Sequence, residues 1–367
     1  MRRRFLNNIK SISGGNDYHL EYFTIEALEN GLTAKLSTNA CEYRIDNGSW
    51  NNLSADSNTL SINKGQTLSF KGNLTPTSST GIGTFTISKK CNLKGNIMSM
   101  LYGDNFNDKN DLTNKDDAFN RLFYNCKTIV DVSDIILPAT TLAEFCYLQM
   151  FSGCTSLTST PELPATTLEY GCYAHMFEGC TSLTTAPELP ATTLVESCYQ
   201  YMFEACTSLT TAPALPATTL AKYCYSNMFD GCTSLTTAPQ LPATTLADWC
   251  YYYMFRDCSS LTTAPELPAT TLADNCYRSM FYNCTSLTTA PELPATTLES
   301  YCYSGMFNGC SKLNYIKMLA TDISANSCLT NWVVGVASSG TFVKNASMTS
   351  LPSGVSGIPN GWTVENA

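Results

Sequence analysis

Apolar positions in the middle of the chain recur with a period of 26 residues. Each copy reads CYxxMFxxC, so a first cysteine (position 0) is followed by Tyr at +1, Met at +4, Phe at +5 and a second cysteine at +8. At 100° per residue these positions fall within an arc of roughly 140° on a helical wheel. The pattern therefore predicts an amphipathic helix of about 11 residues in each copy. The first cysteines of the full copies are Cys146, Cys172, Cys198, Cys224, Cys250, Cys276 and Cys302.

The residues around this segment support a helix followed by a strand. Thr141 precedes Glu144 by three residues, which is the spacing of a capping box. Gly153 and its equivalents before the second cysteine tolerate the left-handed conformation in which many helices end. The following SLTTAPELP suits a short strand, which we expect to end at the proline, such as Pro187, because proline has no N–H.

One strand, one turn and one helix in 26 residues is typical of a leucine-rich repeat. A single copy cannot bury its apolar stripe, so the copies must stack. Degenerate copies at Ala118–Cys126 and Cys328–Val336 flank the array, as expected where an end copy faces solvent on one side. We predict an α/β solenoid over residues 96–336.

The motif CYxxMFxxCTSLT followed by LPATTL resembles the bacterial BspA-type leucine-rich repeat, over about Ala118 to Val336. The resemblance implies a solenoid that is displayed on bacterial surfaces and binds host proteins or other cells. Related repeat proteins are also encoded by phages of gut bacteria. The resemblance therefore suggests a cell-surface or virion-associated location.

The flanking regions lack the 26-residue period. Residues 1–15 form a basic N-terminal arm that begins with Arg2–Arg4, and residues 337–367 are expected to cap the last repeat, with strands at Thr341–Val343 and Gly361–Val364. Residues 16–95 alternate in polarity and contain turn signals, which predicts a small all-β sandwich or Ig-like domain. The strands expected there are Glu21–Leu28, Leu32–Ser37, Glu42–Ile45, Thr59–Ile62, Thr67–Lys71 and Gly83–Ile87.

Composition narrows the possible functions. The formal net charge of −9 argues against nucleic acid as a partner, because phosphate binding needs a basic surface. Polar residues interrupt the apolar stretch after Arg2–Arg4, so we expect no signal peptide, and no segment is apolar enough for a membrane helix.

The 18 cysteines are the most prominent candidate chemistry. We expect most of them to pack as small buried hydrophobic side chains, while disulfides between neighbouring copies remain an alternative. No CxxC pair occurs, and the two histidines are His19 and His175, of which His175 is expected on the surface. No calcium-loop register fits Asp104–Asp117. We therefore expect no metal site, no cofactor and no enzymatic activity.

The copies differ mainly just before the first cysteine and at +2, +3, +6 and +7. Rigid aromatic side chains among small polar ones, as in an antibody paratope, suggest a recognition surface on the helix side. The alternative is sequence drift on a solvated face. The candidate binding residues are Phe145, Tyr170, Tyr201, Tyr223, Trp249, Tyr252, Tyr253, Tyr282 and Tyr301.

These observations predict a non-enzymatic binding or adhesion protein that recognises a cell-surface protein or glycan. The alternative is a structural or receptor-binding component of a phage virion or tail, which its N-terminal region would dock to the particle.

Overall fold

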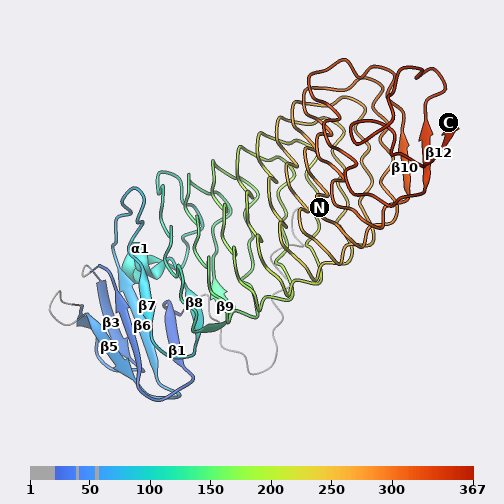
Figure 1. Ribbon diagram of the computed structural model, residues 1–367. Coiled ribbons are helices and arrows are strands. Elements are labelled where there is room, and N and C mark those ends of the chain that lie inside the picture. The colour runs from blue at the N-terminus through green and yellow to red at the C-terminus, as the bar shows by residue number, and fades with distance from the viewer. Residues whose placement is uncertain (1–20, 39–40, 54–57) are drawn as a thin grey trace, which may run out of the picture.

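The computed structural model describes residues 21–38, 41–53 and 58–367. It shows an elongated, curved rod with a small β unit at one end and the C-terminal strands at the other (Figure 1). The predicted basic arm, residues 1–15, lies outside the described residues.

Two sheets form the β unit. The larger has the strand order β4-β3-β6-β1-β8-β9 and the smaller the order β5-β2-β7. Phe70 of the larger sheet and Phe85 of the smaller have ring centroids 5.1 Å apart, so the sheets pack against each other through their aromatic faces. The bounds are β1 (Thr24–Ala27), β2 (Leu32–Leu36), β3 (Cys41–Ile45), β4 (Asn51–Asn52), β5 (Thr59–Ile62), β6 (Thr67–Gly72), β7 (Phe85–Ile87), β8 (Cys91–Asn96) and β9 (Ile129–Ile136).

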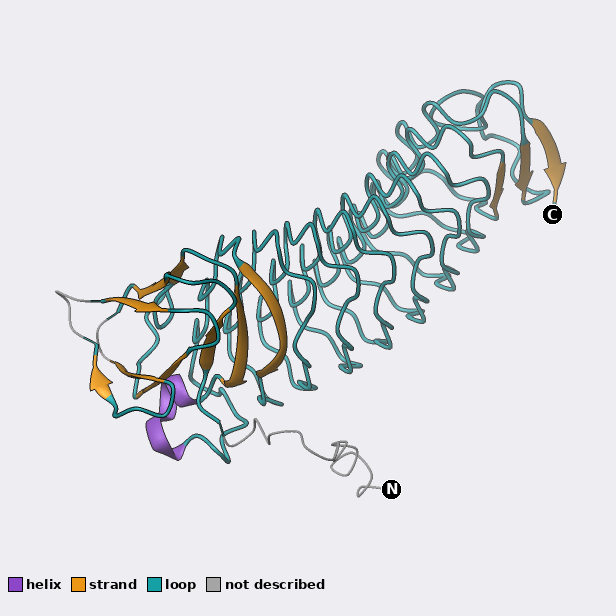
Figure 2. Cartoon of the chain, turned by 90° about the horizontal axis from the view of Figure 1, so that it is seen from below, coloured by secondary structure: helices purple, strands orange, loops and turns teal. Residues whose placement is uncertain are grey.

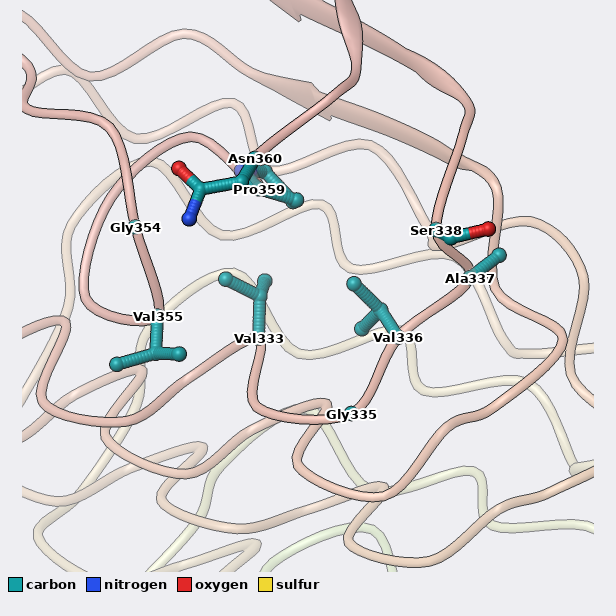
Figure 3. Close-up of a pocket in the computed structure, with 9 residues that line it drawn as sticks. All are labelled: Val333, Gly335, Val336, Ala337, Ser338, Gly354, Val355, Pro359 and Asn360. Atoms are coloured by element: carbon teal, nitrogen blue, oxygen red, sulfur yellow. The ribbon is translucent and has the colours of Figure 1, made fainter.

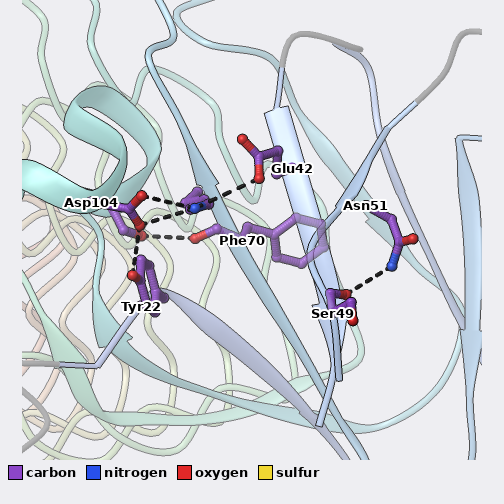
Figure 4. A network of polar contacts seen from close by, with 8 residues as sticks. Tyr22, Glu42, Ser49, Asn51, Phe70 and Asp104 are labelled. Carbon is purple, nitrogen blue, oxygen red and sulfur yellow. Dashed lines mark hydrogen bonds and ion pairs between the residues drawn. The ribbon is translucent and has the colours of Figure 1, made fainter. Parts of the chain in front are cut away.

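The larger sheet continues into the solenoid. Strand β8, which the sequence pattern did not predict, pairs antiparallel with β1 on one side and parallel with β9 of the first copy on the other. The short helices α1 (Ser99–Tyr102) and η3 (Gly103–Asn105) follow β8. They are tied back to the sheet because the Lys71 ammonium lies 2.9 Å from the Asp104 carboxylate, and the Tyr22 hydroxyl donates to Asp104 at 2.7 Å (Figure 4).

The helix predicted for each copy is wrong. Among the described residues the only α-helix is α1, and each CYxxMFxxC segment is a chain of turns (Figure 2). Alternate N–H groups donate to the next copy, as Tyr147 does to the Cys172 carbonyl (3.0 Å), and the others donate three residues back, as Met150 does to the Tyr147 carbonyl (3.2 Å). Bonds between copies thus replace the i→i−4 bonds of an α-helix.

A left-handed residue at every fourth position maintains this arrangement. In the copy of Cys146 these residues are Phe145, Gln149 and Gly153, with φ of 55°, 53° and 74°. An α-helix needs φ near −63° throughout, so it cannot continue through them. The buried positions 0, +1, +4, +5 and +8 therefore follow a period of four, with two residues inward and two outward in each step.

The strand predicted after the second cysteine shrinks to single bridges in the interior copies, such as Thr237 with Thr263. The Ala238 N–H donates to the Thr263 carbonyl at 3.2 Å, and in a parallel ladder the next donor would be the residue after Ala264. That residue is Pro265, which has no N–H. A true strand, β10 (Tyr315–Met318), forms in the last copy, where lysine replaces this proline.

Identical side chains stack in columns inside the rod. The rings at +1 run from Tyr147 to Tyr303 and those at +5 from Phe151 to Phe307, with successive centroids about 5.6 to 6.1 Å apart. All 18 cysteines are buried free thiols, which confirms the packing role predicted for them. The second cysteine of a copy also donates a weak hydrogen bond, as Cys180 Sγ does to the Phe151 carbonyl at 3.2 Å.

The C-terminal residues close the rod where a cap was expected. Strands β10, β11 (Thr341–Lys344) and β12 (Thr363–Asn366) form a parallel sheet. The buried Trp332 ring lies 6.1 Å from Phe342, and its Nε1 donates to the Gly357 carbonyl at 2.9 Å. A hollow of about 150 Å³ beside it has a mainly aliphatic lining that includes Val333, Val336 and Val355 (Figure 3).

Candidate recognition surface

The predicted binding residues lie on the outer side of the turn segments, at positions −2, −1, +2, +3 and +6. We call this side the variable face. All nine are partly or well exposed, with Tyr170 the most open at 40%. They point outward because the turn segments direct two of every four side chains away from the core. They stand on turns and not, as the sequence pattern suggested, on a helix.

Five of the nine meet in one cluster. The Trp249 ring centroid lies 5.7 Å from that of Tyr223 and 4.9 Å from that of Tyr252, and Tyr252 and Tyr253 are 4.1 Å apart. Tyr301 joins through Arg278, whose guanidinium carbon lies 5.1 Å from its ring centroid. These five rings and Arg278 are called the Trp249 cluster.

Arg278 is the cation at the centre of the cluster. Its guanidinium carbon also lies 5.6 Å from the Trp249 centroid and 5.8 Å from the Tyr252 centroid. It donates to Asn275 Oδ1 at 3.2 Å, and within the part of the chain that the structure describes it has no carboxylate partner. Several of its five N–H donors therefore remain available to a ligand.

The other predicted residues lie apart from this cluster. Phe145 and Tyr170 form an edge-to-face pair at 5.0 Å near the start of the array. Tyr201 stacks on His175 at 4.5 Å. Among the described residues, Tyr282 makes none of these ring contacts.

Several cluster aromatics occupy strained backbone. Tyr223, Trp249, Tyr253 and Tyr301 have φ of 57°, 60°, 54° and 56°. A left-handed conformation costs an L-residue roughly 1–2 kcal/mol, and bulky residues held in it concentrate at functional sites. Glycine occupies the position of Trp249 in another copy, at Gly171. The aromatic side chains therefore stand where the backbone alone would favour glycine.

A second group on the variable face was missed by the sequence reasoning, which expected an isolated surface histidine. His175 Nδ1 lies 3.0 Å from Glu178 Oε2, and Glu204 of the next copy lies beside both. The signal was present in the repeat alignment, where position +6 reads Glu178, Glu204, Asp230 and Arg256 in successive copies.

Burial and neighbouring charges shift the pKa values of the acidic residues at position +6. Partial burial, together with the carboxylates of Asp230 and Glu178, raises the pKa of Glu204 to about 7. The hydrogen bond from His175 lowers the pKa of Glu178. Burial raises the pKa of Asp230, against the effect of Arg256, whose Nη2 lies 2.7 Å from its carboxylate.

A family model described as the BspA type leucine-rich repeat region matches residues 117–262 and 250–331 in six copies, which together cover more than half of the chain. The chain belongs to the BspA-type leucine-rich-repeat family. No curated protein matches it. Membership of this BspA-type family indicates protein binding or adhesion in general.

The BspA-type array has a second, more uniform side. Its Thr-Ala-Pro segments form a shallow hollow of about 310 Å³ lined by residues such as Pro213 and Pro239. These segments hardly change from copy to copy, whereas the residues of the variable face do. Among the described residues, no helix is long and apolar enough to cross a membrane.

Proposed function

We propose that this BspA-type protein is a non-enzymatic binding or adhesion protein that recognises a protein or glycan on a cell surface through the Trp249 cluster. The observation that carries the proposal is the meeting of five aromatic rings from three copies, of which three rings contact Arg278 from a fourth copy.

The chemistry of the cluster fits recognition. Trp, Tyr and Arg dominate the binding energy of protein interfaces, because they offer a large contact area with few rotatable bonds. Aromatic rings also provide flat faces for contact with apolar surfaces of a ligand. A face that served only to be solvated would favour lysine and glutamate.

The backbone supports the same reading. Cross-copy hydrogen bonds, such as that from the Trp249 N–H to the Asp274 carbonyl (3.1 Å), hold the turn segments in register. The rings therefore stand on a rigid ladder, so that binding immobilises few groups. Trp249 and Tyr253 occupy positions that have a positive φ in every copy, and both side chains point outward.

The test is a binding screen with the intact protein against bacterial and host cells, their surface proteins and a glycan set. The Trp249→Ala/Tyr253→Ala variant should weaken binding at least ~30-fold, the equivalent of about 2 kcal/mol, while the melting temperature changes little. Arg278→Lys should also weaken binding, because lysine keeps the charge but not the planar donors.

The matched control is Phe145→Ala/Tyr170→Ala, which removes an aromatic pair from the same face but outside the cluster. This variant should bind like the original protein. Equal binding by the Trp249→Ala/Tyr253→Ala variant would exclude the cluster, and an equal loss in the control would mean that the whole variable face binds.

A further inference from the structure

Three metal-ligating side chains meet on the variable face, away from the Trp249 cluster. His175 and Glu178 are at positions +3 and +6 of one copy, and Glu204 is at +6 of the next. One ligand atom from each lies within 4.8 Å of the other two. Two donors bound to one tetrahedral zinc ion stand about 3.4 Å apart, so rotations of the side chains are needed to close the site.

Among the described residues, the acidic side chains at position +6 of successive copies do not all have a neighbouring cation. Asp230 has its own cation, because Arg256 Nη2 lies 2.7 Å from Asp230 Oδ2. Glu204 is partly buried and, in the described ranges, has neither an ion pair nor a side-chain hydrogen bond. Glu204 thus lacks the ion pair that Arg256 forms with Asp230 in the next copy, whereas the ion-pair partner of Glu178 is His175.

Surrounding residues position two of the three ligand side chains, those of His175 and Glu178. The His175 ring stacks on Tyr201 with 4.5 Å between centroids, and the Ser152 hydroxyl donates to Glu178 Oε2 at 3.3 Å. The two copies are joined close to the ligands, because the Gly179 N–H donates to the Glu204 carbonyl at 2.7 Å. Little ordering is left for a bound ion to impose.

We propose that His175, Glu178 and Glu204 bind a divalent transition-metal ion, zinc in the first instance, with water completing the coordination. One imidazole nitrogen and two carboxylates form a donor set that zinc accepts. Calcium is not expected, because it takes six to eight oxygen ligands and the site offers an imidazole among only three side chains. The ion would join two copies of the solenoid.

The experiment titrates Zn²⁺ into the full-length protein by calorimetry and repeats the titration with Co²⁺ by absorption spectroscopy. The variants are His175→Ala and Glu204→Gln. The matched control is Glu188→Gln, which removes the same charge from an exposed position on the Thr-Ala-Pro side. We expect one ion per chain, binding weakened at least about tenfold in both variants, and unchanged binding in the control.

The Co²⁺ spectrum separates this site from the cysteines, because thiolate ligands add a charge-transfer band that imidazole and carboxylate do not. The expected spectrum has no such band. The imidazole signals of His175 should shift on zinc addition in an NMR spectrum, with the assignment made by their loss in His175→Ala. Absence of binding, equal binding by His175→Ala, or a thiolate band would each overturn the proposal.

Discussion

At the residue scale, the backbone of each copy depends on residues that accept a positive φ. Position +7 is glycine in several copies, with φ of 68° at Gly179 and 72° at Gly231, but Ala205 has φ 57° at the same position. One copy therefore carries backbone strain that its neighbours avoid. Because the cross-copy bonds, such as that from the Ala205 N–H to the Asp230 carbonyl (2.7 Å), are the same in all copies, the strained residue stays in register.

We expect Gly231→Ala to lower the free energy of unfolding by about 1 kcal/mol. A Cβ at this position would meet only Ala205, at 3.5 Å from its Cα, so the loss arises from the positive φ and not from a steric clash. Urea denaturation followed by fluorescence measures the change.

The reverse substitution, Ala205→Gly, is the matched partner. It should give a smaller change of opposite sign, since relief of strain is partly offset by the greater freedom of glycine in the unfolded chain. Equal stability of all three proteins would show that the left-handed conformation at this position carries no cost.

At the element scale, the repeat and its core were predictable, but the secondary structure was not. Positions 0, +1, +4, +5 and +8 fit a helical wheel loosely and a period of four without remainder. The sequence also contains Gly171 and Asn275 directly before the first cysteine and Gly305 at position +3, and these residues tolerate a positive φ in mid-segment. Helix propensity depends on the residues within one copy, whereas the hydrogen bonds that decide the backbone conformation join two copies.

For the candidate surface, too, one part could be predicted from the sequence and another part could not. Outward positions follow from the pattern of variation, and all nine aromatic residues are partly or well exposed in the structure. Which of them meet depends on contacts across copies: Arg278 contacts both Trp249 and Tyr301 from neighbouring copies. Glu204 and His175 also come from two copies. Their proximity can be predicted only when the aligned repeats are treated as stacked on one another.

Proline controls where strands form in the array, and Lys317 tests this rule. Lys317→Pro should convert the last copy to the interior pattern by removing the N–H that Lys317 directs toward the preceding copy, whose Leu293 N–H donates to the Lys317 carbonyl at 3.0 Å. We expect a loss of about 1–3 kcal/mol at the C-terminal end, seen as faster hydrogen exchange of the Ala290 and Leu293 amides, which donate to β10.

Lys317→Ala is the control for this change, because it removes the ion pair with Glu292 (2.9 Å) but keeps the backbone N–H. Exchange of the Ala290 and Leu293 amides should stay slow in this variant. Faster exchange in both variants would assign the effect to the side chain and contradict the role given to the backbone donor.

At the scale of the whole molecule, one continuous core runs from Phe23, directly before β1, to Trp362 near the C-terminus. Cysteine thiols and tyrosine hydroxyls line much of its length, because positions 0, +1 and +8 repeat in every full copy. Burial raises the pKa of these groups: it is about 12 for Cys172, Cys206 and Cys224, against an ordinary value of 9.0. The buried tyrosines, such as Tyr173, shift in the same direction.

These shifts predict a steep loss of stability in alkali. In the unfolded chain the cysteines lose their protons above pH 9.0, while in the folded rod they keep them up to about 12. The stabilising contribution is therefore complete below the unfolded pKa and is lost as the pH rises toward the folded one. Each ionising group contributes about 1.4 kcal/mol per pH unit, and the contributions of successive copies add.

The measurement is the urea midpoint of the reduced protein at several pH values from about 7.5 to 10.5. We expect a nearly constant midpoint below pH 9 and a sharp decline above it. A Cys172→Ala/Cys198→Ala variant, which removes two of the titrating thiols from adjacent copies, should begin with lower stability but decline less steeply. Parallel curves for the two proteins would mean that the buried thiols do not cause the alkaline transition, and a flat curve for the original protein would contradict the raised pKa of the whole column.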